Sequence, residues 1–156
     1  MSFDPKWGGP ERAEFPELIS WTQRPEQGIK YYSGKATYRK TFELPQGLRG
    51  ARTRMALDLG EVKNLAQVRL NGKYLGVLWT KPFRVEITAA VKPAANVLEV
   101  DVVNLWPNRI IGDAALPPER RLTRTNINYK KDDPLLESGL LGPVTLQVIE
   151  TVDSRR

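Results

Sequence analysis

Apolar and polar residues alternate with a period of two along most of this chain. Between residues 53 and 59, Met55, Leu57 and Leu59 alternate with small or polar neighbours. This alternation places every second side chain on the same face and is typical of a half-buried β-strand. It predicts strands at 36–44, 53–59, 64–70, 74–79, 82–88, 96–104 and 143–152.

The turns between these segments favour antiparallel pairing. Asn71-Gly72 lies between 64–70 and 74–79, and both residues accept the positive φ of a tight hairpin. Helical patterns are short, with room for one turn each at 61–65 and 88–92. Seven or so short strands predict an all-β fold, either an antiparallel sandwich or a barrel, and we favour a jelly-roll β-sandwich.

Two regions do not follow the strand pattern. Residues 1–34 are rich in aromatic residues, Gly and Pro, and we expect an ordered arm packed on the sandwich, with room for one strand at 15–21. Residues 105–142 predict one long irregular loop, and such a loop inside a compact domain is usually functional or an interface. The predicted organisation is thus an arm at 1–34, a sandwich domain at 35–152 and a tail at 153–156.

Composition removes many kinds of chemistry. The chain has 156 residues and 17.7 kDa, which is the size of one domain. It has no cysteine and no histidine. Disulfides, thiolate metal sites, cysteine nucleophiles and the Ser-His-Asp triad are therefore excluded, and most enzyme classes become less favoured.

The net charge of +6 allows anionic partners, but its distribution does not favour them. Acidic residues interleave most of the basic groups, so we expect a solvated surface and no nucleic-acid partner. These groups are Arg49, Arg52 and Arg54; Arg120, Arg121 and Arg124; Lys130 and Lys131; and Arg155 and Arg156.

The sequence also gives no reason to expect a membrane partner. No stretch approaches the roughly 18–20 apolar residues of a membrane span, and the first residues lack a signal-peptide pattern. The cellular location therefore stays open.

Short motifs spread over nearly the whole chain carry a family resemblance. The most specific are NLWPNRIIGD (104–113) and SGLLGP (138–143). The others are FDPKWGGP (3–10), WTQRPE (21–26), IKYYSG (29–34), ATYRKTF (36–42), LDLGEV (57–62), VRLNG (68–72), LGVLW (75–79), PFRVEIT (82–88) and PLL (134–136). With these motifs the chain resembles the C-terminal, galactose-binding-like β-sandwich of family 106 α-L-rhamnosidases. It is more distantly similar to the sugar-binding jelly roll of family 2 glycosidases.

The resemblance implies a non-catalytic domain. Family 106 enzymes are much longer and carry their catalytic groups in a preceding (β/α) barrel, which this sequence does not contain. The resemblance therefore implies a carbohydrate-binding or accessory domain whose partner is an oligosaccharide or polysaccharide, with rhamnose-containing glycans as candidates. The alternative is a structural domain that docks on a glycosidase catalytic barrel and completes its active site. If the chain is part of a bacterial glycosidase, a secreted or periplasmic location is expected.

Trp79 and Trp106 are the first candidate carbohydrate contacts. Trp79 ends the predicted strand 74–79, and Trp106 opens the long loop after 96–104. An exposed indole stacks on the C–H face of a sugar ring. The alternative for each is a cap on the hydrophobic core or an interface with a catalytic barrel.

Polar candidates lie in the predicted loop. Asn108, Arg109 and Asp113 offer the donors and acceptors that vicinal hydroxyls need, and by analogy with family 2 enzymes the first two would face a catalytic pocket. The alternative is an internal Arg109–Asp113 pair that braces the loop. Tyr129 is a further candidate, with a plain surface loop as its alternative.

No catalytic residue and no cofactor is expected. Asp132-Asp133 are adjacent in sequence, and Glu119 and Glu137 lie in the predicted loop without an implied barrel pocket for a glycosidase carboxylate pair. Carbohydrate-binding sandwiches often hold a structural calcium ion, but the sequence has no loop with EF-hand spacing and names no ligands.

Overall fold

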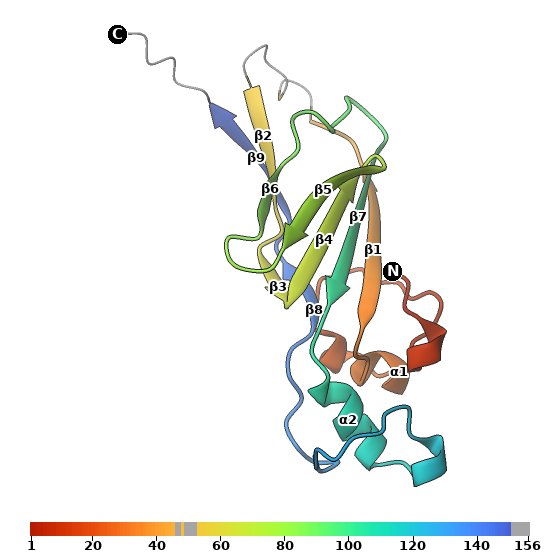
Figure 1. Cartoon of the computed structure of the whole chain (residues 1–156). Helices are drawn as coiled ribbons and strands as arrows, with labels where there is room; N and C mark the ends of the chain where they lie inside the picture. Colours follow the sequence, from red (N-terminus) through yellow and green to blue (C-terminus); the bar gives the residue numbers. More distant parts are fainter. Residues whose placement is uncertain (46–47, 49–52, 151–156) are drawn as a thin grey trace.

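The computed structural model describes residues 1–45, 48 and 53–150, and it contains two main β-sheets (Figure 1). The predicted tail at 153–156 and the basic residues Arg49, Arg52, Arg155 and Arg156 lie outside the described residues. One sheet has the order β1 (Lys35–Phe42), β7 (Asn96–Val103), β4 (Leu65–Leu70) and β5 (Lys73–Leu78). The other has the order β6 (Arg84–Glu86), β2 (Thr53–Asp58) and β9 (Thr145–Glu150), and a small ladder joins β3 (Glu61–Lys63) to β8 (Gly139–Gly142).

The strands pair antiparallel, and the two main sheets enclose the core between them. Val68 on β4 and Val100 on β7 point inward from one sheet, and Met55 and Leu57 on β2 belong to the same buried cluster. The alternation in the sequence therefore corresponds to one buried and one outward face, and the prediction of an antiparallel β-sandwich is confirmed.

The predicted hairpin joins β4 to β5. Asn71 and Gly72 both adopt positive φ, of 55° and 80°. The Asn71 side chain also accepts a hydrogen bond from the Val97 amide at 2.9 Å and donates to the Ala90 carbonyl at 2.8 Å. The turn thus fixes the register of β4 and β5 and ties the hairpin to the start of β7.

The N-terminal arm contains short helices instead of the strand expected at 15–21. These are η1 (Pro5–Trp7), η2 (Trp21–Gln23) and α1 (Gln27–Lys30). Trp21, Ile29 and Tyr32 are fully buried and belong to the core cluster of the sandwich. The 15–21 prediction was wrong because a chain segment with Pro16 next to η2 inserts single large side chains into the core and does not add an edge strand.

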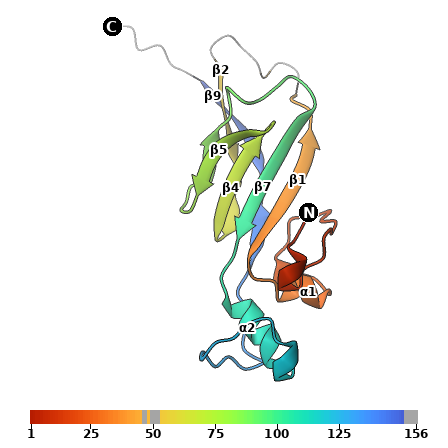
Figure 2. The same ribbon diagram turned by 45° about the vertical axis from the view of Figure 1, so that its right-hand side comes forward.

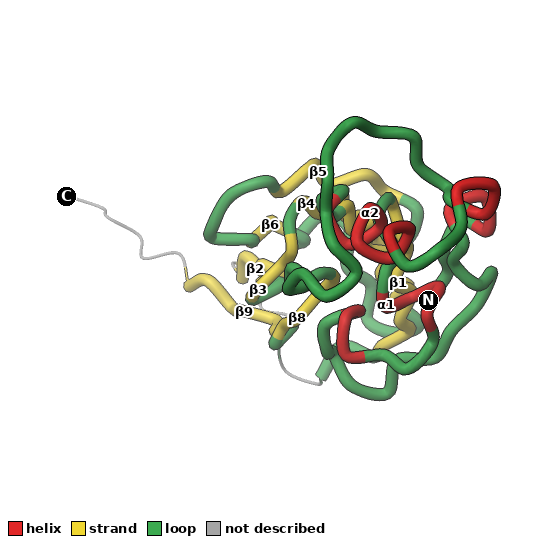
Figure 3. The backbone as a smooth tube through the Cα atoms, turned by 90° about the horizontal axis from the view of Figure 1, so that it is seen from below, coloured by secondary structure: helices red, strands yellow, loops and turns green. Residues whose placement is uncertain are grey.

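The region 105–142 is more regular than the single long loop we expected. It contains α2 (Pro107–Ala114), η3 (Pro118–Arg120) and β8. Together with α1 and the N-terminal arm, α2 lies at one end of the sandwich (Figure 1, Figure 2, Figure 3). Of the two predicted helical turns, 61–65 is instead occupied by β3 and the start of β4, whereas Ala90 and Val91 close one turn on the Ile87 carbonyl.

Candidate functional site

Helix α2 organises the end of the sandwich where most of the sequence candidates lie. Pro107 occupies its first turn, where a missing backbone N–H costs no hydrogen bond. Five of its eight residues are buried, namely Asn108, Arg109, Ile111, Gly112 and Asp113. The helix is therefore a packed element with a polar buried face.

Asn108 ties α2 to the segment before β8. Its amide group donates to the Leu136 carbonyl at 2.7 Å and to Ser138 Oγ at 3.0 Å, and its carbonyl oxygen accepts from the Leu136 amide at 2.8 Å. Because the side chain has no exposed surface, these internal bonds use its polar atoms. The structure does not bring Asn108 to the surface as a sugar contact.

Arg109 and Asp113 form a buried ion pair one helical turn apart. The distance from Arg109 Nη2 to Asp113 Oδ1 is 3.1 Å, and both side chains are less than a tenth exposed. Asp113 Oδ2 also accepts bonds from the Thr123 amide at 2.7 Å and from Thr123 Oγ1 at 2.6 Å. The pair braces the segment after η3 against α2, which is the alternative to carbohydrate contact that the sequence left open for these residues.

The Arg109 guanidinium is not fully satisfied. Its Nε is buried and has no hydrogen-bond partner among the described residues. Gly8 and Gly112 pack against the guanidinium, since a Cβ at either position would meet its nitrogens at 3.4 and 2.7 Å. This close packing of backbone on both sides restricts the position of the Arg109 guanidinium.

Trp106, at the start of α2, and Trp79, directly after β5, are both exposed, with exposed fractions of 59% and 74%. Leu78, which precedes Trp79, and Val102 in β7 are both paired with Ala66 of β4. The C-terminal ends of β5 and β7 therefore lie on the same side of the sheet, with only β4 between the two strands. The spacing of strands separates the two ends by about 10 Å.

Trp7 is an aromatic neighbour that the sequence analysis did not assign to a site. Its ring contacts Trp106 edge-to-face, with the ring centroids 6.0 Å apart. η1 and its Gly8 cap, which has φ of 80°, present Trp7 to α2. The long-range contact between the arm and α2 leaves no local pattern in the sequence.

The same end also exposes several aliphatic side chains and carries the last aromatic candidate. Tyr129 is half-buried in the segment between η3 and β8. The exposed aliphatic residues of this region are Leu105, Leu122, Ile127 and Leu136. Exposed charged residues such as Arg120, Arg124 and Lys131 lie in the same segment. The surface formed by Trp7, Trp106 and these aliphatic residues is therefore apolar and aromatic with charged neighbours, and we call it the α2 end.

The described part of the chain contains neither a candidate metal cluster nor a candidate membrane-spanning helix. No group of three or more Asp and Glu side chains among the described residues has an arrangement that could hold a metal ion. No helix in that part is long and apolar enough to cross a membrane.

The chain matches one protein-family model. Residues 21–129 match the family described as "Glycosyl hydrolase 2 galactose-binding domain-like". This stretch covers β1 to β7 and α2, and it therefore includes both Trp79 and Trp106.

Much longer proteins contain a similar region. A Formosa agariphila protein with the name "Putative beta-glucuronidase" is 42% identical over 88% of this chain. The rhamnosidase structure from Novosphingobium sp. PP1Y has a TM-score of 0.85 and 40% identity over 93% of this chain. This chain spans only 14% of the length of either protein.

A more distant match shows the fold alone. The β-glucuronidase of Bifidobacterium dentium, solved with coumarin-3-O-glucuronide, has a TM-score of 0.64 and 24% identity over 96% of this chain. The chain spans 27% of that enzyme.

Proposed function

Because the chain belongs to the glycosyl hydrolase 2 galactose-binding domain-like family, we propose that it is a non-catalytic accessory domain that binds carbohydrate. The single observation that carries this proposal is the exposure of Trp79 and Trp106, which follow two strands, β5 and β7, that end on the same side of the sheet. We further propose that its parent proteins are enzymes related to the family 106 α-L-rhamnosidases, on the sequence motifs and the likeness to the Novosphingobium rhamnosidase.

Stacking on the indoles supplies the binding energy in this proposal. A pyranose ring presents a flat face of C–H groups, and an exposed aromatic ring removes that face from water. Because Trp106 lies three residues beyond the end of β7, a ligand that contacts both rings in this proposal is an oligosaccharide and not a single sugar. The edge-to-face contact with Trp7 restricts the Trp106 ring before any sugar binds.

The buried polar residues have a supporting role in this proposal. Asn108, Arg109 and Asp113 hold α2 and therefore the backbone that carries Trp106, while their polar atoms are used inside the domain. Tyr129 remains a proposed contact at the edge of the same surface.

Titration of the intact chain with a panel of rhamnose-, galactose- and glucuronate-containing oligosaccharides tests the proposal. We expect calorimetric binding that Trp79→Ala and Trp106→Ala each weaken by at least about tenfold. Tyr74→Ala is the matched control, because Tyr74 is a 58% exposed aromatic residue at the other end of β5. Equal affinity of all three variants, or no binding at millimolar sugar, would contradict carbohydrate binding at Trp79 and Trp106.

A second candidate function is docking on a catalytic domain. The aliphatic residues of the α2 end favour it, because Leu105, Ile127 and Leu136 are 45–56% exposed and offer a sugar no aromatic face. The relatives are also about seven times longer than this chain, so most of each relative lies outside the matched region.

The docking function has its own test. The Novosphingobium rhamnosidase with its matching region deleted would be mixed with this chain, and co-elution in gel filtration would be measured. Docking predicts a complex that Ile127→Asp and Leu136→Asp disrupt and that Tyr74→Asp leaves intact. Absence of a complex would count against docking while leaving the sugar titration unaffected.

A further inference from the structure

A polar groove lies away from the α2 end, between the N-terminal arm and the outward face of β1 and β7. It has a volume of about 630 Å³. Its lining includes Arg12 and Glu14 from the arm, Thr37, Arg39 and Thr41 from β1, and Glu99 from β7. This volume lies within the range of about 300–1,000 Å³ that is usual for small-ligand pockets.

Backbone hydrogen bonds fix both walls of the groove. Ser2 and Thr37 exchange two bonds of 2.9 Å, and Ala13 donates to the Met1 carbonyl at 2.9 Å. Phe3, next to Ser2, is 5% exposed and anchors the arm in the core. The arm is therefore held at a defined distance from the sheet, which gives a groove that exists before a ligand binds.

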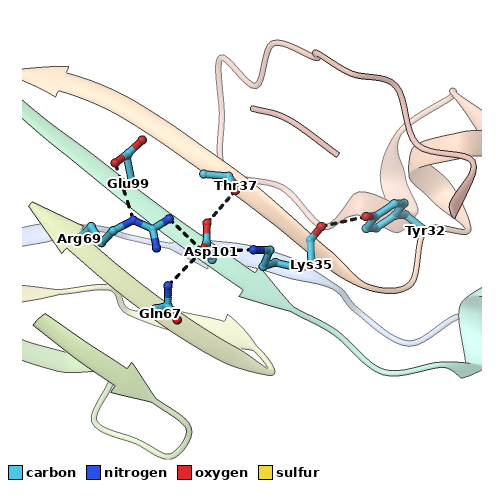
Figure 4. A network of polar contacts seen from close by, with 7 residues as sticks. All are labelled: Tyr32, Lys35, Thr37, Gln67, Arg69, Glu99 and Asp101. Atoms are coloured by element: carbon cyan, nitrogen blue, oxygen red, sulfur yellow. Dashed lines mark hydrogen bonds and ion pairs between the residues drawn. The ribbon is translucent and has the colours of Figure 1, made fainter. Parts of the chain in front are cut away.

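A buried carboxylate orients the floor of the groove. Asp101 alternates to the outward face of β7 yet is only 2% exposed, because neighbouring side chains cover it (Figure 4). It accepts hydrogen bonds from Thr37 Oγ1 at 2.7 Å, Arg69 Nη2 at 2.9 Å and Gln67 Nε2 at 3.3 Å, and Lys35 Nζ lies 3.8 Å away. Burying a charge is costly unless it is paired and hydrogen-bonded. The buried Asp101 carboxylate therefore restricts the positions of the side chains that donate to it.

This arrangement fixes two acceptors that line the groove. The Thr37 hydroxyl proton points to Asp101, so the lone pairs of Thr37 Oγ1 remain for another donor. Arg69 Nε lies 3.8 Å from Glu99 and fixes that carboxylate from the other side (Figure 4). Both acceptors thus have defined positions on one face.

Two donors in the groove have no partner among the described residues. Arg39 lies directly opposite Glu99 in the β1–β7 register, but Glu99 is paired with Arg69. Neither Arg39 nor Arg12 has a hydrogen bond or ion pair with any described residue. Both residues line the groove, and the N–H donors of each guanidinium remain available to a ligand.

We propose that this groove is a second saccharide site, which binds a single sugar unit through its vicinal hydroxyls. Arg39 and Arg12 donate to hydroxyl oxygens, and Glu99 and Thr37 accept from hydroxyl groups. The site goes beyond the proposed function at Trp79 and Trp106, because it uses other elements and none of its lining residues is aromatic. Because the groove has no stacking surface, we expect a dissociation constant for a monosaccharide on the order of 1 mM.

Amide chemical-shift mapping by NMR tests the proposal on the intact chain. The probes are methyl α-L-rhamnopyranoside, methyl β-D-galactopyranoside and D-glucuronate, each up to about 20 mM, well above the expected dissociation constant. We expect saturable shifts at the amides of Thr37, Arg39 and Thr41 with at least one probe. Absence of shifts at these amides with all three probes overturns the proposal.

Matched variants separate a specific site from weak general binding. Arg39→Ala removes an unpartnered side chain and should weaken binding at least about fivefold without changing stability. Lys40→Ala, at the next position of β1, is the control because its side chain lies outside the groove lining. Equal binding by the two variants overturns the proposal. The Trp79→Ala and Trp106→Ala variants should keep the groove shifts, so failure of the tryptophan site and failure of the groove are distinguishable.

Discussion

Trp21 Nε1 donates a buried hydrogen bond of 2.7 Å to Tyr38 Oη, which links the N-terminal arm directly to β1. The same oxygen accepts from the Leu140 amide of β8 at 3.0 Å. Burial raises the pKa of the Tyr38 phenol above its ordinary value of 10, although these two hydrogen bonds oppose the shift. One hydroxyl group therefore connects three segments that are far apart in the sequence.

Removing this hydroxyl should destabilise the domain. Tyr38→Phe keeps the ring but leaves two buried N–H donors unpaired, at a cost of about 1–3 kcal/mol in the free energy of unfolding. Urea denaturation followed by circular dichroism measures the change. Tyr74→Phe is the control, since Tyr74 is exposed and should change stability by less than about 0.5 kcal/mol. Equal stability of the two variants would show that the Trp21–Tyr38–Leu140 junction contributes nothing.

The Arg109–Asp113 pair should be more sensitive to the loss of one partner. Asp113→Ala leaves the Arg109 charge buried without a counter-ion and also removes the acceptor of Thr123. We expect destabilisation by about 3–5 kcal/mol, as for other broken buried pairs. The measurement is again chemical denaturation.

Asp132→Ala provides the comparison for this prediction. Asp132 is exposed and has no interaction with any described residue, so its loss should change stability by less than about 0.5 kcal/mol. If Asp113→Ala proves as mild as Asp132→Ala, the pair does not brace α2.

The sequence predicted strands well wherever one face is buried and the other meets water. In β2 and β4 the alternation of Met55 and Leu57, or of Ala66 and Val68, follows directly from that environment. Helix α2 lacks such a signal because its buried face carries Asn108, Arg109 and Asp113 instead of an apolar stripe. Pro107 and the four-residue spacing of Arg109 and Asp113 were the available clues.

The burial of Asp101 and the contact between Trp7 and Trp106 depend on residues that are far apart in the sequence, so the sequence alone did not predict them. Alternation places Asp101 on the outward face of its strand, where a carboxylate normally meets water. Its burial depends on Thr37 and Gln67, which are opposite it only through the register of three strands. Trp7 likewise reaches Trp106 across a separation that no local pattern records.

Stability should fall in acid through the Arg24–Glu26 pair. The bidentate hydrogen bonds from Arg24, and then a backbone hydrogen bond, lower the pKa of Glu26 from 4.5 to about 2. Because the folded-state pKa is depressed, the contribution of Glu26 is complete above about pH 4.5 and is lost as the pH falls towards 2. We therefore expect the melting temperatures of the wild type and Glu26→Gln to differ at neutral pH and to converge near pH 2.

Two further measurements make this prediction specific. The pair lies at the surface, so high salt should reduce the difference in melting temperature between the wild type and Glu26→Gln. Glu17→Gln is the control, because Glu17 is exposed and has no hydrogen bond or ion pair with a described residue. A Glu26→Gln melting profile parallel to the wild type from pH 7 to pH 2 would contradict the assignment.

Alanine variants at Gly139 and Gly76 distinguish the cost of a steric clash from the cost of backbone strain. Both adopt a positive φ, 107° and 122°, that L side chains rarely accept, so alanine at either position is strained. A Cβ at Gly139 would also meet Trp21 Nε1 at 2.5 Å and Tyr38 Oη at 2.7 Å, whereas at Gly76 it would meet nothing within 4 Å. Gly76→Ala should therefore lower the free energy of unfolding by about 1–3 kcal/mol from strain alone.

Gly139→Ala should lower the free energy of unfolding clearly more, because it also displaces the Trp21–Tyr38 hydrogen bond. Combining Gly139→Ala with Tyr38→Phe should cost less than the sum of the two single changes. Additive costs in that double-mutant cycle would show that Gly139 acts independently of the junction.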